Sequence, residues 1–228
     1  MPSWQIMRWE EPNFDIAAAP LYVRQAYEAR KFAFVSDYVR LWALEKFGGL
    51  YMDVDFMVYR PFDELMSKHA AFAGYEGSKR QPVMQGVIAS EPHGAWVTDM
   101  LGTYKTRPFI KPDGSLDMYP NTQYFTDRLE SQGFAADGVE KDFYVKSISN
   151  LQSPISNLEE RLFFLHVFPV HYFCPVLTTG ENVRNEETYC EHMGESSWAQ
   201  MNWKSRLLQR ISPVRRTKLI KFKRKLLG

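Results

Sequence analysis

Two aspartates separated by one residue, Asp53 and Asp55, are the side chains in this chain best suited to chemistry. They follow a short apolar run, residues 50–52, that is typical of a β-strand. Because side chains alternate faces along a strand, we expect the two aspartates to point the same way. Two carboxylates on one face repel each other unless a cation lies between them, and Mg²⁺ and Mn²⁺ favour such oxygen ligands together with substrate phosphates. The pattern predicts a metal–diphosphate site.

The segment before the aspartates predicts the helix that positions them. Ser36 is a good N-cap, and Asp37 in the first turn would suit the positive end of the helix dipole. Gly48 and Gly49 supply the left-handed stop. The apolar residues of one helical face are Tyr38, Leu41, Trp42 and Ala43.

Asp37 and Arg40 lie three residues apart and therefore share one side of this helix. Taken alone, they have a simpler interpretation, an acid at a helix start and an i,i+3 ion pair. Asp53 and Asp55 taken alone also fit ordinary turn residues at the end of a strand.

Length and composition indicate one globular α/β domain. The chain has 228 residues, of which 45% are hydrophobic and 15% aromatic, enough for one sizeable core. We find no apolar run near the roughly 20 residues that a membrane span needs, and no signal peptide at the N-terminus. Cys174 and Cys190 are too few for a disulfide framework and too far apart for a metal knuckle, so we expect two reduced thiols and a cytoplasmic protein.

The charge is distributed unevenly along the chain. Residues 204–228 hold ten Lys or Arg and no acid, which leaves 18 basic against 27 acidic residues elsewhere. Aliphatic residues are interleaved with these basic ones, a pattern that suits an anionic membrane surface. A solvated helix packed on the domain, or a disordered basic tail, fits the same pattern. We expect no nucleic acid partner, because the tail lacks base-stacking motifs and the rest of the chain is acidic.

Strands alternating with helices predict a mixed sheet. We expect a domain over residues 1–203 and a basic amphipathic helical tail over 204–228. The expected strands are residues 4–9, 50–52, 56–59, 70–75, 82–90, 143–147 and 162–173, the last an edge or broken strand because of Pro169 and Pro175. The expected helices are residues 21–31, 36–47, 93–104 and 121–130, with a short helical turn after Pro61.

The order of these motifs resembles a known family. S-D-Y-x-R at residues 36–40, then Gly-Gly, then D-x-D, with a late H-x-x-x-S-x-W at residues 192–198, is similar to the sugar-binding region of DXD glycosyltransferases. That family is typified by yeast initiation mannosyltransferases and bacterial capsular-polysaccharide enzymes, and is related to the glucosyltransferase domain of large clostridial toxins. Residues 9–16, 26–38 and 84–93 fit the resemblance too, which extends from about Trp4 to Trp198.

The resemblance implies a GT-A fold, a UDP- or GDP-sugar donor, Mn²⁺ or Mg²⁺, and retention of anomeric configuration. Matched by motif, Asp55 would bind the metal directly, Asp53 would hold ribose or sugar and contact the metal, and Asp37 and Arg40 would grip the sugar hydroxyls. The late segment would close over the diphosphate and complete the metal shell. Its residues are His192, Ser196 and Trp198.

Four residues beyond the D-x-D segment have simpler alternatives. His192 fits an ordinary surface residue, and Trp198 an ordinary core anchor. Asn121 and Gln123, at the start of a helix after a flexible loop, are candidates for the acceptor side, with simple helix capping as the alternative.

Family members usually begin with a strand upstream of the segment that matches residues 2–9, and we expect that strand to be missing here. The leading hypothesis is a retaining, metal-dependent glycosyltransferase that acts on a cell-surface polysaccharide or lipid-linked acceptor, with the basic tail at the inner face of the membrane. The alternative is a catalytically impaired relative that acts as a membrane-associated partner in polysaccharide assembly. A phosphohydrolase with Asp53 as nucleophile would need a small hydroxyl residue near position 57, where Met57 stands, and a downstream acid pair that we do not find.

Overall fold

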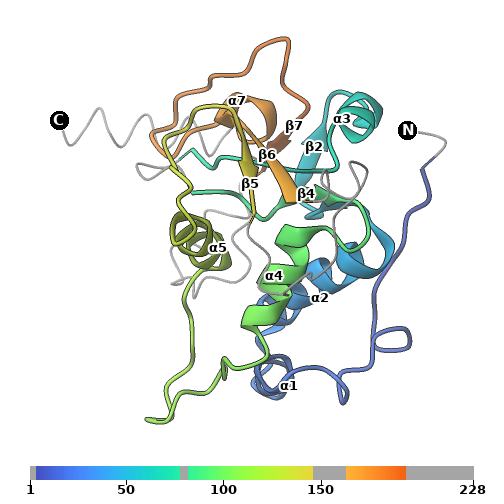
Figure 1. The fold of residues 1–228 in the computed structure, drawn as a ribbon, viewed down its shortest axis with the longest axis vertical. Coiled ribbons are helices and arrows are strands. Elements are labelled where there is room, and N and C mark those ends of the chain that lie inside the picture. The colour runs from blue at the N-terminus through green and yellow to red at the C-terminus, as the bar shows by residue number, and fades with distance from the viewer. Residues whose placement is uncertain (1–3, 78–81, 146–162, 194–228) are drawn as a thin grey trace, which may run out of the picture. The chain divides into compact units, whose positions relative to one another are not determined.

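A five-stranded mixed sheet organises the computed structural model, which describes residues 4–77, 82–145 and 163–193 (Figure 1). The strand order is β1-β4-β3-β6-β5. The β3–β6 pair is parallel and the other neighbouring pairs are antiparallel, which confirms the predicted α/β fold with a mixed sheet, consistent with a GT-A-like domain. The strands are β1 (Gly49–Met52), β3 (Ala71–Gly74), β4 (Val87–Ser90), β5 (Lys141–Tyr144) and β6 (Phe164–Phe168).

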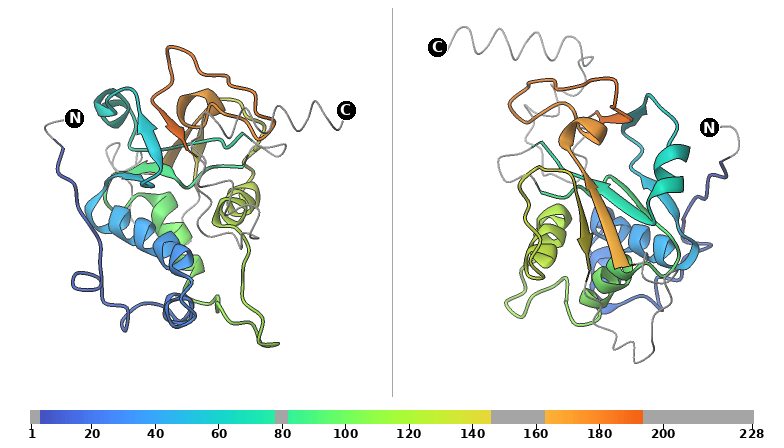
Figure 2. Two further views of the ribbon diagram at one scale, coloured as in Figure 1. Left: turned by 180° about the vertical axis from the view of Figure 1, so that it is seen from behind. Right: turned by 45° about the horizontal axis from the view of Figure 1, so that its top comes forward.

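Helices and short elements cover the two faces of this sheet (Figures 1 and 2). Helices α1 (Leu21–Glu28), α2 (Phe32–Phe47) and α4 (Ala95–Thr103) pack together on one face, and α3 (Asp63–Lys68) and α7 (Val170–Phe173) lie on the other. Helix α5 (Asn121–Glu130) has the bounds that the sequence predicted.

Alternation along the strands divides the core in two. Leu165 and Val167 of β6 join the cluster under α1, α2 and α4, whereas Phe168 joins the cluster under α3 and α7. Phe72 of β3 belongs to this second cluster, and its neighbours Ala71 and Ala73 belong to the first. A strand buried on both faces in this way reads as a continuous apolar run, which is why β3 was readable from the sequence.

A second, two-stranded sheet connects distant parts of the chain. Strand β2 (Phe56–Val58) pairs in antiparallel fashion with β7 (Cys190–His192), and Phe56 lies opposite His192. The residues that follow the aspartate pair are therefore fixed beside residues more than 130 positions later in the chain.

Two predicted strands need correction. Residues 4–9 form no strand; Trp9 packs instead against Trp42 and Phe47, and the Trp4 indole donates a hydrogen bond to Asp63. Side-chain contacts of Trp4 and Trp9, and not backbone hydrogen bonds to a neighbouring strand, thus hold residues 4–9 against the domain. Residues 162–173, predicted as an edge or broken strand, form a strand over Phe164–Phe168 alone; the strand is broken before Pro169 but does not lie at an edge. Strand β6 lies between β3 and β5, and Pro169 ends it and begins α7, so the proline never interrupts a ladder.

Helix α2 also begins four residues earlier than predicted, at Phe32. The Ser36 hydroxyl is not an N-cap; it donates a hydrogen bond to the Ala33 carbonyl inside the helix. Phe34 and Val35 are buried in the first cluster, so the apolar face of the helix extends back past Ser36. Asp37 therefore lies in the second turn, where it cannot act as a first-turn acid.

Both cysteines are free, as predicted, and both are buried. Burial raises the pKa of the Cys174 thiol to about 11, so it is a packing residue and not a reactive thiolate at neutral pH.

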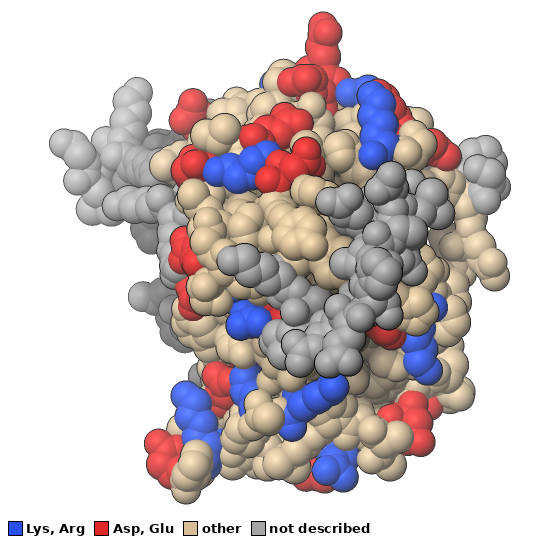
Figure 3. Space-filling model, in the orientation of Figure 1, with Lys and Arg blue, Asp and Glu red and all other residues tan. Residues whose placement is uncertain are grey.

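Within the three described ranges, no helix combines the length and the apolar character needed to cross a bilayer. Lys and Arg are interspersed with Asp and Glu on the face drawn in Figure 3. The predicted tail, residues 204–228, lies outside the described residues, as does the predicted domain boundary at 203.

The end of α2 depends on a glycine, which yields a stability prediction. Gly48 has φ of +65°, and a Cβ added there would lie 2.6 Å from Pro92 Cδ. We expect Gly48→Ala to lower the free energy of unfolding by about 2 kcal/mol, because it adds backbone strain and a clash. Urea unfolding measures this. Gly102→Ala in α4 is the matched control: its Cβ would meet open space, so stability should be unchanged or rise by up to about 1 kcal/mol. Equal effects of the two variants would contradict this account.

Candidate functional site

The Arg40 guanidinium is the centre of the candidate site. Its Nη2 lies 2.9 Å from Asp37 Oδ1 and 3.7 Å from Asp53 Oδ1. The i,i+3 ion pair that served as the simpler interpretation therefore exists, but it includes a third partner from beyond the helix. Arg40 links the helix to the D-x-D turn.

Arg40 is held rigidly by further contacts. Its Nη1 donates a hydrogen bond of 2.7 Å to the Gln85 carbonyl, and its guanidinium lies 4.6 Å from the centre of the Tyr51 ring. Its Nε donates to the Ser36 carbonyl. The side chain is only 7% exposed. A guanidinium with this many partners has a fixed orientation, which suits recognition of a polar ligand by planar, directional donors.

Burial dominates the electrostatics of this pair. Burial raises the pKa of Asp37, against the opposite effect of Arg40, and the nearby Asp53 carboxylate raises it further. Burial opposes the charge on Arg40, yet Tyr51, Asp37 and Asp53 together raise the pKa of Arg40 above its ordinary value. Arg40 is thus a permanent cation shared between two carboxylates.

The D-x-D segment forms a turn and not a strand continuation. Strand β1 ends at Met52, and β2 starts at Phe56. The Asp53 backbone N–H donates to the Gly86 carbonyl at 2.8 Å, and the Tyr51 hydroxyl donates to the Asp53 carboxylate. Val54 at the tip is fully exposed. Strand alternation does not apply to residues in a turn, and the two aspartates have different partners.

Asp55 pairs with the late histidine that the sequence singled out. Asp55 Oδ2 lies 3.0 Å from His192 Nε2, and the His192 ring stacks on Phe56 with 4.9 Å between ring centres. An oxygen ligand and a nitrogen ligand therefore lie side by side. A third acid, Glu76, is near: burial raises its pKa, His192 lowers it and Asp53 raises it.

These donors fit a divalent cation. Carboxylates are ordinary ligands for Mn²⁺ and Mg²⁺, whereas an imidazole suits a transition-metal ion such as Mn²⁺ better than it suits Mg²⁺. Such ions usually keep several waters and substrate oxygens in their shell. Among the described residues, His, Cys, Asp and Glu side chains come together in one tight group of three, and that group lies elsewhere. A metal at Asp55 would therefore take part of its coordination from water or phosphate.

A cluster of polar aromatic residues adjoins Asp37. The Arg107 guanidinium lies 4.0 Å from the Tyr124 ring centre and 4.4 Å from that of Tyr22, and Arg107 pairs with Asp117 at 3.1 Å. Asp37 raises the pKa of Tyr104, although burial is the larger cause.

Sequence reasoning missed Arg107 and Tyr104, because neither belongs to a spaced motif. Gln85 and Gly86, by contrast, lie in the segment 84–93 that the resemblance included.

The remaining predicted residues have varied positions. Asn121 is the first residue of α5, and Pro120 is the N-cap. The Asn121 side chain does not cap the helix; its Oδ1 accepts a hydrogen bond of 3.3 Å from the Tyr104 hydroxyl. This contact joins Asn121 to the Asp37 side of the site. Gln123 is the third residue of α5 and lies in its first turn. Ser196 and Trp198 lie outside the described residues.

Comparison with known proteins decides what this arrangement resembles. Residues 1–72 match the family described as "Glycosyltransferase sugar-binding region containing DXD motif". The family resemblance is confirmed over this segment. It contains Asp37, Arg40, Asp53 and Asp55, so the buried ion-pair network lies within the matched region.

A curated protein also matches part of the chain. Glucan organizing enzyme 1 of Cryptococcus neoformans var. grubii is 29% identical over 85 residues, which cover 34% of this chain and 23% of that protein. The chain thus matches less than a quarter of the length of this relative. No solved structure matches the chain.

The raised pKa of Asp37 predicts a pH dependence of stability. A carboxyl whose folded-state pKa exceeds its unfolded value of 3.8 binds protons more readily when folded, so its contribution to stability falls as pH rises from about 4 through the raised pKa. In the Asp37→Asn variant, the free energy of unfolding should therefore decrease less over this pH range than in the wild type. Urea unfolding across pH 4–8 tests this; identical pH profiles for the wild type and the variant would contradict it.

Proposed function

We propose that this protein is a metal-dependent glycosyltransferase that moves a sugar, with retention of configuration, from a UDP- or GDP-sugar to a polysaccharide or lipid-linked acceptor. The observation that carries the proposal is the Arg40 bridge between Asp37 and Asp53, located inside the segment that matches the sugar-binding family. A structural ion pair on the helix would not need a partner from the D-x-D turn. The network instead supports a site that holds a polar ligand between helix α2 and that turn.

The charges of the network suit sugar hydroxyls. The Asp37 carboxylate accepts hydrogen bonds, and the Arg40 guanidinium donates them, so together they discriminate the positions of neighbouring hydroxyl groups. Arg40 is already fixed by Gln85 and Ser36, which removes most of the entropic cost of ordering it on binding. Asp53, whose side chain is 33% exposed, borders the solvent side of the pair and is placed to contact the donor.

Asp55, His192 and Asp53 are the residues proposed to hold the metal. When bound, a divalent ion supplies positive charge beside the diphosphate that leaves with the nucleoside. His192 is positioned by Phe56 through ring stacking and by the β2–β7 pairing, which fix its imidazole beside Asp55. Ser196 and Trp198 follow four and six residues later, and we propose that they close over the diphosphate.

The acceptor side of the proposed site includes Asn121 and Gln123. Asn121 reaches the Asp37 side through Tyr104, and its Nδ2 is buried among the described residues without a hydrogen-bond partner. A buried amide donor without a partner is costly, and a ligand oxygen would satisfy it. This supports a ligand-facing role over helix capping.

Loss of the metal ligand should abolish turnover. With Mn²⁺ and a panel of UDP- and GDP-sugars, the wild type should hydrolyse at least one donor in a metal-dependent way, and Asp55→Ala should lower that rate by about 10²-fold or more because diphosphate charge is no longer offset. Nucleoside diphosphate release measures the rate. Asp15→Asn, an exposed acid within the same matched segment, is the control and should keep full activity.

Two results would overturn the proposal. One is the absence of metal-dependent turnover with every donor. The other is an Asp55→Ala variant as active as the wild type. Donor binding by the wild type without turnover, detected by calorimetry, would instead support the catalytically impaired assembly partner.

The proposed acceptors lie at membranes, and the basic tail is proposed to hold the protein at the inner face. Its ten Lys and Arg residues would each contribute about 1 kcal/mol near an anionic surface. We expect the full chain to co-sediment with vesicles containing anionic lipid at low salt, and removal of residues 204–228 to abolish this binding. A variant of the full chain with Arg215, Arg216 and Lys218 changed to Gln should bind about a hundredfold more weakly. Binding unchanged by both alterations would defeat the idea.

A further inference from the structure

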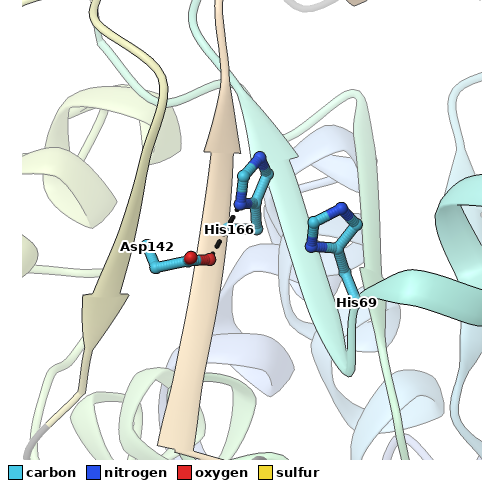
Figure 4. Close-up of side chains that lie close together, drawn as sticks. All are labelled: His69, Asp142 and His166. Atoms are coloured by element: carbon cyan, nitrogen blue, oxygen red, sulfur yellow. Dashed lines mark hydrogen bonds and ion pairs between the residues drawn. The ribbon is translucent and has the colours of Figure 1, made fainter.

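A second group of ligating side chains lies on strands β5 and β6 and just before β3, away from the D-x-D turn (Figure 4). Asp142 of β5 lies directly opposite His166 of β6, and His69 precedes β3, the strand on the other side of β6. One ligand atom from each of the three residues lies within 4.8 Å of the other two. Residues separated by up to 97 positions thus meet because the sheet order is β3-β6-β5.

The hydrogen bonds of His166 leave one nitrogen in an unusual situation. Its Nδ1 lies 2.8 Å from Asp142 Oδ1, and its Nε2 lies 3.1 Å from Glu140 Oε1. A neutral imidazole has one N–H, so it donates to only one of the two carboxylates. The other nitrogen presents its lone pair to a carboxylate oxygen, a repulsive contact unless a proton or a cation lies between them.

His69 places a second imidazole beside this contact. The two ring centres are 4.0 Å apart, and the planes differ by 33°. A neutral imidazole has one nitrogen without a proton, so His69 has a lone pair that it can offer to a metal.

We propose that His69, Asp142 and His166 bind a divalent transition-metal ion, with Zn²⁺ as the best match. Two imidazoles and one carboxylate are a common Zn²⁺ ligand set, whereas Mg²⁺ favours oxygen ligands. Glu140 then accepts the Nε2–H of His166, which fixes the tautomer and leaves Nδ1 for the ion. Ligating histidines usually have such a carboxylate partner on the other nitrogen.

The geometry accommodates this ion with small movements. Zn–N and Zn–O distances of about 2.0–2.2 Å place ligand atoms roughly 3.2–3.5 Å apart in a tetrahedron. The three ligand atoms now lie within 4.8 Å of one another, and His166 Nδ1 and Asp142 Oδ1 are already 2.8 Å apart, so the His69 ring is the group that would move toward the other two. His166 is 10% exposed and already fixed by its two carboxylates. Three protein ligands leave the fourth position to water, and the ion would link β3, β6 and β5 on the face of the second core cluster.

Calorimetry with Zn²⁺ on the chelator-treated full chain tests the proposal. Among the Zn²⁺ sites detected, we expect one that His69→Gln and Asp142→Asn each weaken about a hundredfold and Glu140→Gln about tenfold. Co²⁺ in place of Zn²⁺ should give the visible absorption of a tetrahedral site, and His69→Gln should remove it. His93→Gln is the matched control, because His93 is an exposed histidine paired with another glutamate, Glu45.

The outcomes separate this site from the proposed catalytic one. Asp55→Ala should leave the affinity for Zn²⁺ and the Co²⁺ spectrum unchanged, since Asp55 is not among the ligands. No Zn²⁺ binding by the wild type, or wild-type affinity in both His69→Gln and Asp142→Asn, would overturn the proposal and identify the cluster as an imidazolium held by two acids. Should His69→Gln unfold, as judged by circular dichroism, the exposed Asp142→Asn variant decides alone.

Discussion

The buried guanidinium of Arg40 is the constraint on which the surrounding structure depends. A buried cation costs several kcal/mol unless its partners are close and well oriented. Its partners come from three segments: Asp37 on its own helix, Asp53 after β1, and the carbonyl of Gln85 before β4. Satisfying one side chain therefore fixes how α2 lies against the β1–β4 edge of the sheet, and removing any partner would leave a charge unpaired inside the protein.

The sheet supports two chemically different groups of residues. The first core cluster, under α1, α2 and α4, supports the helix that carries Asp37 and Arg40. The second cluster contains Phe72 and Phe168, and Phe168 contacts the rings of both His69 and His166. Oxygen-rich ligands thus gather at the end of β1, and imidazoles gather over β3 and β6. This separation follows from the sheet order, because β1 lies at one edge of the sheet and β4 lies between it and the β3–β6 pair.

Local patterns predicted much of this structure. Helix α5 and strands β1 and β3 follow from Pro120, the two glycines after α2, and short apolar runs, signals that act within a few residues. The start of α2 was misplaced, because burial of Phe34 and Val35 outweighs the capping tendency of Ser36. The strand at residues 4–9 was wrong, because pairing needs a partner and the tryptophans there found aromatic contacts instead. The aspartate pair and Arg40 were readable as a spaced motif. The histidine cluster was not, since only the strand order brings its residues together.

The D-x-D turn has a mechanical consequence. Asp53 ends the run from β1 in the five-stranded sheet, while Asp55 leads into β2 in the two-stranded sheet, and its partner His192 lies on β7. The separation of the two carboxylates therefore reports the relative position of two sheets, with the exposed Val54 as the joint between them. Any difference in how the β2–β7 pair lies against the five-stranded sheet would therefore change the gap between these carboxylates. Asp53 is thus held by Arg40 in the core, whereas Asp55 is paired with His192, near the end of the described residues.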